Sequence, residues 1–152
     1  MNAKNYALFL LGRRAYTERM LRDKLTNKKY PKNEIERVLA LCKKYNYIND
    51  YDYGKNLILS RDRTSPRGRY ALVQELRSKG VEEKVITCIF QDEIFATRSE
   101  VALAGAVIRQ KLPRYATIKK HIARQKCYSL LARRGFDPEI IRSAINENFR
   151  QS

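Results

Sequence analysis

Three stretches of the chain share one pattern of apolar residues: LTNKKYPKNEIERVL at residues 25–39, LRSKGVEEKVITCIF at 76–90 and LARRGFDPEIIRSAI at 131–145. In each stretch the apolar residues keep the same offsets from the leading leucine, while the residues between them vary. A spacing kept at three places indicates three copies of one supersecondary unit, each burying part of its apolar face against its neighbours. The alternative is a chance similarity among amphipathic helices. The repeated positions are Leu25, Tyr30, Ile35, Val38 and Leu39; Leu76, Val81, Ile86, Ile89 and Phe90; and Leu131, Phe136, Ile141, Ala144 and Ile145.

The residue before the second apolar position predicts where a helix ends in each copy. That residue is Lys29 in the first copy, Gly80 in the second and Gly135 in the third. Glycine is favoured where a helix ends in the left-handed conformation, because it has no Cβ atom to clash. We therefore expect a helix to end at each of these positions and another helix to follow.

The composition favours an all-helical protein. Hydrophobic residues make up 43% of the 152-residue chain, tryptophan is absent, and glycine and proline are few. The alternation typical of strands is hard to find. We expect an all-α fold of three tandem three-helix repeats, comprising residues 1–48, 49–95 and 96–152, that form an elongated array because tandem units contact mainly their neighbours.

Capping residues and prolines predict where several helices begin. Thr17 and Asn33 precede apolar stripes in the first repeat and are good N-cap residues. Ser65-Pro66 and Asp137-Pro138 each combine a capping residue with a proline, which is favoured at the first position of a helix. The third repeat is expected to begin near Thr97.

The charge of the chain indicates an anionic partner. Lysine and arginine number 32 against 16 acidic residues, which gives a net charge of +16. Residues 1–50 carry 12 basic and 5 acidic side chains, residues 51–100 carry 9 and 8, and residues 101–152 carry 11 and 3. Nucleic acid, an acidic protein or a membrane surface could neutralise such a charge. Repulsion between copies of this charge should also keep the protein monomeric.

The sequence predicts a cytoplasmic protein with free thiols. Its longest apolar run near the N-terminus, residues 6–11, is too short to cross a bilayer and is not followed by a small-residue cleavage site. The three cysteines, Cys42, Cys88 and Cys127, lie far apart among apolar positions. This spacing suits neither a disulfide framework nor a zinc site, so we interpret them as buried thiols.

The sequence shows no catalytic or cofactor-binding pattern. His121 is the only histidine and lies in the basic run Lys119-Lys120-His121, without a nearby carboxylate to orient it as a general base. No glycine-rich phosphate loop and no metal-ligand spacing is present. We expect a protein that is not an enzyme and that has no cofactor and no metal.

The candidate binding residues are clustered cations. An expected connection gathers four arginines around a single aspartate, which gives no obvious benefit to folding, whereas guanidinium groups suit phosphate or carboxylate partners. Other basic pairs lie near expected helix ends. The alternative interpretation of these pairs is that they face solvent and are stabilised by the negative end of the helix dipole. The candidates are Arg61, Arg63, Arg67 and Arg69, with Lys28, Lys29, Arg133 and Arg134 in addition.

Tyrosines are a second class of candidate, since aromatic rings can stack on bases. Tyr30 and Tyr47 occupy apolar positions of the pattern and are interpreted as core residues. Tyr51, Tyr53 and Tyr70 remain as candidates for stacking.

Several motifs resemble the RecX family of RecA regulators. They are residues 38–42 (VLALC), 47–50 (YIND), 74–81 (QELRSKGV) and 134–136 (RGF), and the similarity extends over nearly the whole chain. The chain departs from the family pattern at Asn46, where glycine is common, and at Gly54, where alanine is common. Residues 64–69 match the family's basic segment only loosely.

The resemblance implies a fold and a role. RecX proteins are described as three three-helix repeats in an elongated, curved, basic molecule. They bind the groove of the RecA–DNA filament and suppress ATP hydrolysis, strand exchange and co-protease activity, in homologous recombination, DNA repair and the SOS response. For this chain, the resemblance implies that the partner is the RecA nucleoprotein filament.

The alternative is a freestanding basic helical module that binds DNA or RNA through helix-turn-helix-like pairs. Such a module needs one exposed recognition helix that reads bases, whereas the charge of this chain is spread over three units, which suits a long groove better. Direct binding to single- and double-stranded DNA is expected to be weak and without sequence preference.

Overall fold

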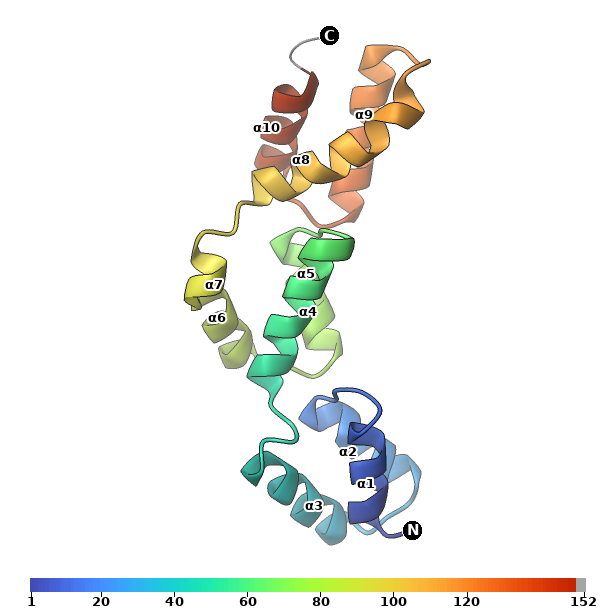
Figure 1. Ribbon diagram of the computed structural model, residues 1–152, viewed down its shortest axis with the longest axis vertical. Coiled ribbons are helices and arrows are strands. Elements are labelled where there is room, and N and C mark those ends of the chain that lie inside the picture. The colour runs from blue at the N-terminus through green and yellow to red at the C-terminus, as the bar shows by residue number, and fades with distance from the viewer. Residues whose placement is uncertain (150–152) are drawn as a thin grey trace. The chain divides into compact units, whose positions relative to one another are not determined.

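The computed structural model describes residues 1–149, and every regular element in that part of the chain is helical (Figure 1). The last three residues of the expected third repeat, 150–152, lie outside it. The predicted all-α fold of successive three-helix units is confirmed. The elements are α1 (Ala3–Leu11), α2 (Glu18–Asn27), α3 (Lys32–Lys44), α4 (Asp50–Thr64), α5 (Arg69–Ser78), α6 (Glu83–Gln91), α7 (Glu93–Ala96), α8 (Glu100–Lys111), the 3₁₀ helix η1 (Leu112–Tyr115), α9 (Lys120–Arg133) and α10 (Pro138–Phe149).

Three domains of three helices account for most of these elements. The first domain contains α1, α2 and α3, the second contains α4, α5 and α6, and the third contains α8, α9 and α10. The expected boundary after residue 48 falls in the connection between α3 and α4, and the boundary after residue 95 falls within the short helix α7.

The repeated spacing of the sequence is explained by one kind of turn. The middle helix of each domain ends with a backbone N–H that donates to the carbonyl five residues earlier, from Tyr30 to Leu25, Val81 to Leu76 and Phe136 to Leu131. This bond closes a Schellman turn, whose penultimate residue is left-handed. The φ angles there are 66° at Lys29, 92° at Gly80 and 83° at Gly135, as predicted.

The apolar positions of the pattern form the cores of the domains. All of them are buried except Tyr30 and Phe90, which are half-buried. The prediction that Tyr47 is a core residue is wrong, because its side chain is 53% exposed while that of the next residue, Ile48, is 4% exposed. Asn46 has a left-handed φ of 59°, which turns the chain so that Ile48 faces the core.

Some predicted helix starts are confirmed and others are wrong. The Thr17 hydroxyl accepts the N–H of Met20 at the start of α2, and α10 begins at Pro138. Helix α3 begins before Asn33, directly after Pro31, without a side-chain cap. Helix α5 begins at Arg69 rather than at Ser65-Pro66, and α8 begins after the N-cap Ser99 rather than at Thr97.

The chain divides into two compact units, and the middle domain is shared between them. The first unit combines Met1–Asn56 with Leu76–Gln91, and the second combines Leu57–Glu75 with the residues from Asp92 onward. Each half of the middle domain therefore belongs with a neighbouring domain.

In the first unit, the turn at the end of α5 lies against the start of α2. The buried hydroxyl of Thr17 donates to the carbonyl of Lys79 at 2.5 Å, and the Arg19 guanidinium donates to the carbonyl of Ser78 at 2.5 Å. A Cβ atom on Gly80 would lie 2.6 Å from the Cβ of Arg19. A side chain at position 80 would therefore push the turn away from α2.

In the second unit, the turn at the end of α9 lies against the start of α5 in the same way. The N–H of Gly68 donates to the carbonyl of Arg134 at 2.8 Å. A Cβ atom on Gly135 would lie 2.4 Å from the Cβ of Ala71. The same kind of junction therefore occurs twice, which explains why both turns use glycine, and why the chain between Ser65 and Gly68 is not yet helical.

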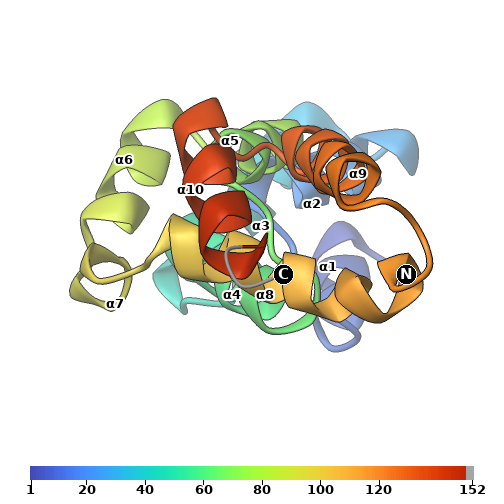
Figure 2. The same cartoon turned by 90° about the horizontal axis from the view of Figure 1, so that it is seen from above.

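The third domain packs α10 against both α8 and α9, and α8 runs obliquely across the other two (Figure 1 and Figure 2). Its core includes Val107, Ile108, Cys127, Leu131 and Ile141. The 3₁₀ helix η1 follows α8 directly, with a proline in its first turn.

The cysteine prediction is correct for Cys42 and Cys127, which are buried, and wrong for Cys88, which is exposed. Burial raises the pKa of the Cys42 and Cys127 thiols above the ordinary value. Cys88 lies between the buried Ile86 and Ile89 on α6 and faces outward because the helical period places it on the opposite side. Among residues 1–149, no helix has both the length and the apolar character that crossing a membrane requires.

Candidate nucleic-acid and partner interface

The sequence suggested that the four arginines between residues 61 and 69 share one loop. In the structure they do not. Arg61 and Arg63 lie in the last turn of α4, Arg67 lies in the connection, and Arg69 is the first residue of α5. They divide into two pairs by exposure, since Arg61 and Arg67 are half-buried whereas Arg63 and Arg69 are exposed.

Arg61 and Arg67 both contact Glu75, whose side chain is only 13% exposed. Nε and Nη2 of Arg61 donate to the two carboxylate oxygens at 3.1 and 2.6 Å, and Nη1 of Arg67 donates to Oε1 at 3.4 Å. A carboxylate taken out of water is costly unless it is paired. The expectation that this cluster contributes nothing to folding is therefore wrong for these two arginines.

A further arginine that the sequence did not suggest lies next to this cluster. The Arg98 side chain is 8% exposed and donates to both oxygens of Asp62 at 2.9 Å and to the carbonyl of Arg67 at 2.9 Å. Burial lowers the pKa of Arg98, but Asp62 and Glu100 outweigh it, so the pKa lies above its ordinary value. Arg98 thus fixes the connection that carries Arg67. Nothing in the local sequence indicated this pairing across 36 residues.

Lys28 and Lys29 occupy the exposed turn between α2 and α3. The ammonium group of Lys28 lies 5.2 Å from the centre of the Tyr6 ring. Both residues remain candidates for contact with an anionic partner.

Arg133 and Arg134 have different environments at the end of α9. Arg134 is half-buried, and burial together with the nearby charge of Arg67 lowers its pKa from the ordinary value. Its carbonyl accepts the N–H of Gly68, so Arg134 belongs to the junction between domains. Arg133 is exposed and lines a groove.

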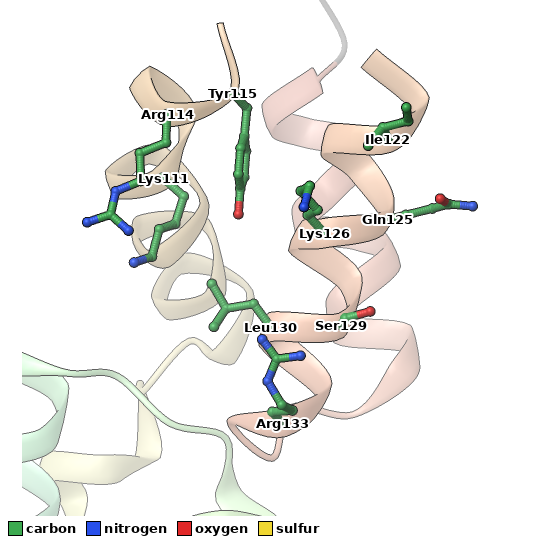
Figure 3. A pocket seen from close by; sticks show the side chains of 9 residues that line it. All are labelled: Lys111, Arg114, Tyr115, Ile122, Gln125, Lys126, Ser129, Leu130 and Arg133. Atoms are coloured by element: carbon green, nitrogen blue, oxygen red, sulfur yellow. The ribbon is translucent and has the colours of Figure 1, made fainter. Parts of the chain in front are cut away.

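The groove lies between the end of α8, η1 and α9 in the third domain, and Figure 3 shows its lining side chains. Its volume is about 590 Å³. Lys111 and Arg114 lie on one wall, α9 forms the other, and the Tyr115 side chain hangs between the two walls. The lining residues are Lys111, Arg114, Tyr115, Ile122, Gln125, Lys126, Ser129, Leu130 and Arg133.

The groove is strongly basic. Four of its lining residues are cations and none is acidic. Within residues 1–149, none of the four cations, Lys111, Arg114, Lys126 and Arg133, forms an ion pair. Their charges are therefore available to an anionic ligand.

Sequence reasoning identified only Arg133 among these four cations. Lys126 lies seven residues before Arg133, which places both on one face of a helix, and this spacing could have been noticed. Lys111, the last residue of α8, and Arg114, in η1, join them only through the packing of the third domain, which the residue spacing does not specify.

The tyrosine candidates are separated along the chain. Tyr70 is 71% exposed on α5, while Tyr51 and Tyr53 are half-buried on α4. Tyr45 and Tyr47, which the sequence did not indicate as binding residues, form an exposed stacked pair with ring centroids 5.9 Å apart.

Potential metal ligands are not grouped in the described part of the chain. Among residues 1–149, no three histidine, cysteine, aspartate or glutamate side chains are grouped so that they could hold a metal ion. His121 lies exposed in the first turn of α9.

Comparison with known proteins matches each domain in turn. Family models described as the first, second and third three-helix domains of RecX match residues 3–42, 49–88 and 99–145. A regulatory protein RecX from Pelodictyon phaeoclathratiforme is 33% identical over 143 residues, which cover 94% of this chain and 86% of that protein. Another from Haemophilus influenzae is 31% identical over 150 residues, covering 96% and 94%.

Solved structures share the fold. The crystal structure of RecX from Lactobacillus salivarius matches with a TM-score of 0.82 at 20% identity, over 96% of this chain and 94% of that one. A second crystal structure, of a regulatory protein RecX, matches with a TM-score of 0.79 at 22% identity, over 99% and 72%. With the domain matches and the relatives of more than 30% identity, these findings show that the chain belongs to the RecX family of regulatory proteins.

Proposed function

We propose that the protein binds the RecA nucleoprotein filament in its helical groove and inhibits RecA ATPase, strand exchange and co-protease activity. It would thereby modulate homologous recombination, DNA repair and the SOS response. It would act in the cytoplasm as a monomer, by binding rather than by catalysis. Contact with single- and double-stranded DNA would be weak and without sequence preference.

The observation that carries the proposal is the match of all three domains, in order, to RecX domains. Exposed cations in each domain support it: Lys28 and Lys29 in the first, Arg63 and Arg69 in the second, and Arg133 in the third. A filament repeats its subunits along a groove, so a chain of tandem domains can make several modest contacts at once. Each contact raises the effective concentration for the next.

The spread of these cations also separates the proposal from a freestanding DNA- or RNA-binding module. A sequence-specific module should prefer its own site over unrelated DNA by about a thousandfold or more. A filament regulator needs no such preference, because its specificity comes from the protein partner.

The test is the rate of ATP hydrolysis by RecA on single-stranded DNA, measured with increasing amounts of the protein. We expect a dose-dependent loss of ATPase activity that is accompanied by loss of strand exchange. Unchanged ATPase together with tight, sequence-selective binding to free DNA would favour the freestanding module instead.

A further inference from the structure

We propose that the basic groove of the third domain binds one single strand of nucleic acid, with its phosphodiester groups on Lys111, Arg114, Lys126 and Arg133 and a base against Tyr115. The proposal rests on the proposed function and deepens it, because it assigns the surface that touches the DNA within a RecA–DNA filament.

The charge of the groove favours a polyanion. Four cations line a hollow of about 590 Å³ that contains no carboxylate. A concave surface lined by one sign of charge focuses its field and attracts counterions of the opposite sign. Elsewhere in the described chain, the arginine cluster is partly neutralised by Glu75, which accepts from both Arg61 and Arg67. No acidic residue lines the groove, so we expect its cations to bind an external anion.

The spacing of the cations suits a chain of phosphates rather than one isolated anion. Lys126 and Arg133 lie on α9 seven residues apart, which corresponds to about 10 Å along a helix. Successive phosphates of one stacked strand rise by about 3.4 Å each. The two side chains can therefore contact phosphates about three nucleotides apart, with Lys111 and Arg114 on the facing wall (Figure 3).

The shape of the groove favours a single strand over a duplex. Its cations lie on two facing walls, which can enclose one flexible backbone, whereas a duplex presents its phosphates on a convex surface. The half-buried ring of Tyr115 hangs between the walls. Unpaired bases can stack on such a ring, and Ile122 and Leu130 of α9 add apolar surface to the lining of the groove. Basic tracks with interspersed aromatic rings are the usual means of holding single strands.

The first experiment measures binding of the full chain to a fluorescent oligo-dT by anisotropy, without RecA. The double variant Lys111→Gln/Lys126→Gln removes one cation from each wall. The matched control Lys4→Gln/Lys24→Gln removes the same charge from two exposed lysines of the first domain. We expect the groove variant to lose about tenfold in affinity and the control to lose less than about twofold at equal salt.

The salt dependence gives an independent readout. Each phosphate contact on a single strand contributes about 0.7 to the slope of log affinity against log salt concentration. The groove variant should therefore have a slope smaller by about 1.4, while the control keeps the slope of the unmodified protein. Circular dichroism of each variant should be unchanged.

The second experiment tests Tyr115. The variant Tyr115→Ala should lose about fivefold or more in affinity for oligo-dT, whereas Tyr115→Phe, which keeps the ring, should bind like the unmodified protein. A duplex of the same length should be bound equally by all three proteins, since its bases are already stacked.

Three outcomes would overturn the proposal: equal losses in the groove variant and the control, an unchanged salt slope, or displacement of oligo-dT by polyglutamate at equal charge concentration. The last would make the groove an acidic-peptide site. The proposed function is tested separately by RecA ATPase. If the unmodified protein inhibits RecA ATPase but does not bind oligo-dT, the proposed function stands and the proposal for the groove is wrong.

Discussion

The backbones of Gly68 and Gly135 lie in direct contact. They are so close that a Cβ atom on Gly68 would lie 2.2 Å from the carbonyl oxygen of Gly135. The contact joins the connection before α5 to the turn after α9. A hydrogen bond of 2.8 Å from the Gly68 N–H to the neighbouring Arg134 carbonyl holds it. Glycine is therefore required on both sides of this junction, for different reasons: space at Gly68, and both space and a left-handed φ of 83° at Gly135.

Replacing Gly135 with alanine should destabilise the protein by about 2 kcal/mol or more. Alanine is strained in the left-handed backbone conformation, and its Cβ atom would lie 2.4 Å from the Cβ atom of Ala71. The matched control is Gly12→Ala, because Gly12 has a φ of −69° and its nearest neighbour would be 3.4 Å away. That change should cost less than about 0.5 kcal/mol. Urea titrations of both variants check this, and equal midpoints would contradict it.

Replacing Thr17 with valine should cost about 1 to 3 kcal/mol. The Thr17 hydroxyl donates to the Lys79 carbonyl and accepts from the Met20 N–H, and valine keeps the shape while losing both bonds. Thr17→Ser keeps both bonds and should be less destabilising than Thr17→Val. Thermal unfolding distinguishes the two variants, and a valine variant as stable as the serine one would show that the hydroxyl contributes little.

Reversing the exposed arginines, Arg63→Glu/Arg69→Glu, should weaken inhibition of RecA ATPase while the helical content stays unchanged, because the Glu75 ion pairs are left intact. A matched reversal, Lys4→Glu/Lys24→Glu, should inhibit more strongly than this variant. Dose–response curves on single-stranded DNA check this. Equal inhibition by all proteins would show that these two arginines do not contact the filament.

Replacing Arg61 with leucine should instead lower stability, by about 1 kcal/mol. The Glu75 side chain, which is 13% exposed, then keeps the longer contact with Arg67 at 3.4 Å but loses its bidentate partner. A double-mutant cycle with Glu75→Gln should show coupling between the two positions. Additive free energies of unfolding would show that the pair is not coupled.

Replacing Asp50 with asparagine should change how stability depends on pH. Burial raises the pKa of Asp50 above its ordinary value, and the charges of Glu18 and Glu82 add to this. The folded state therefore binds the proton more tightly than the unfolded state, so ionised Asp50 lowers stability at neutral pH and this penalty disappears as pH falls through the raised pKa. Asparagine can still accept the Glu18 N–H, which Asp50 accepts at 3.0 Å.

At neutral pH the Asp50→Asn variant should thus be at least as stable as the unmodified protein, and its advantage should shrink as the pH is lowered. Glu36 and Glu83, whose pKa values are lowered chiefly by hydrogen bonds from Arg22 and Arg77, are present in both proteins and cancel in the difference. Urea titrations at several pH values check this. An advantage that grows toward low pH would contradict it.

The sequence allowed the local features of the fold to be predicted. The bond from Phe136 to Leu131 closes within six residues, so the spacing of the pattern and Gly135 were enough to place the turn. The pairing of Arg61 with Glu75 spans 14 residues and that of Arg98 with Asp62 spans 36. Such pairs depend on how helices pack, which the spacing of residues does not specify.

The same limit applies to the candidate site. Arg133 could be nominated because it stands out as a basic residue at a helix end. Lys111, at the end of α8, and Arg114, in η1, face α9 across the groove, and this placement depends on how the helices pack. The ligand of the groove stays a proposal, as do the roles of Arg63 and Arg69.

Lys29 has a further consequence for how copies of the chain can associate. It occupies the left-handed position that Gly80 and Gly135 occupy in the other two turns. Those two turns fit against a helix start only because a Cβ atom is absent, and Lys29 has both a Cβ atom and a charge. A second copy that offered its helix start to this turn would meet a Cβ atom and a charge that the turns at Gly80 and Gly135 lack. Lys29 therefore disfavours, at this turn, the head-to-tail contact from which open polymers grow.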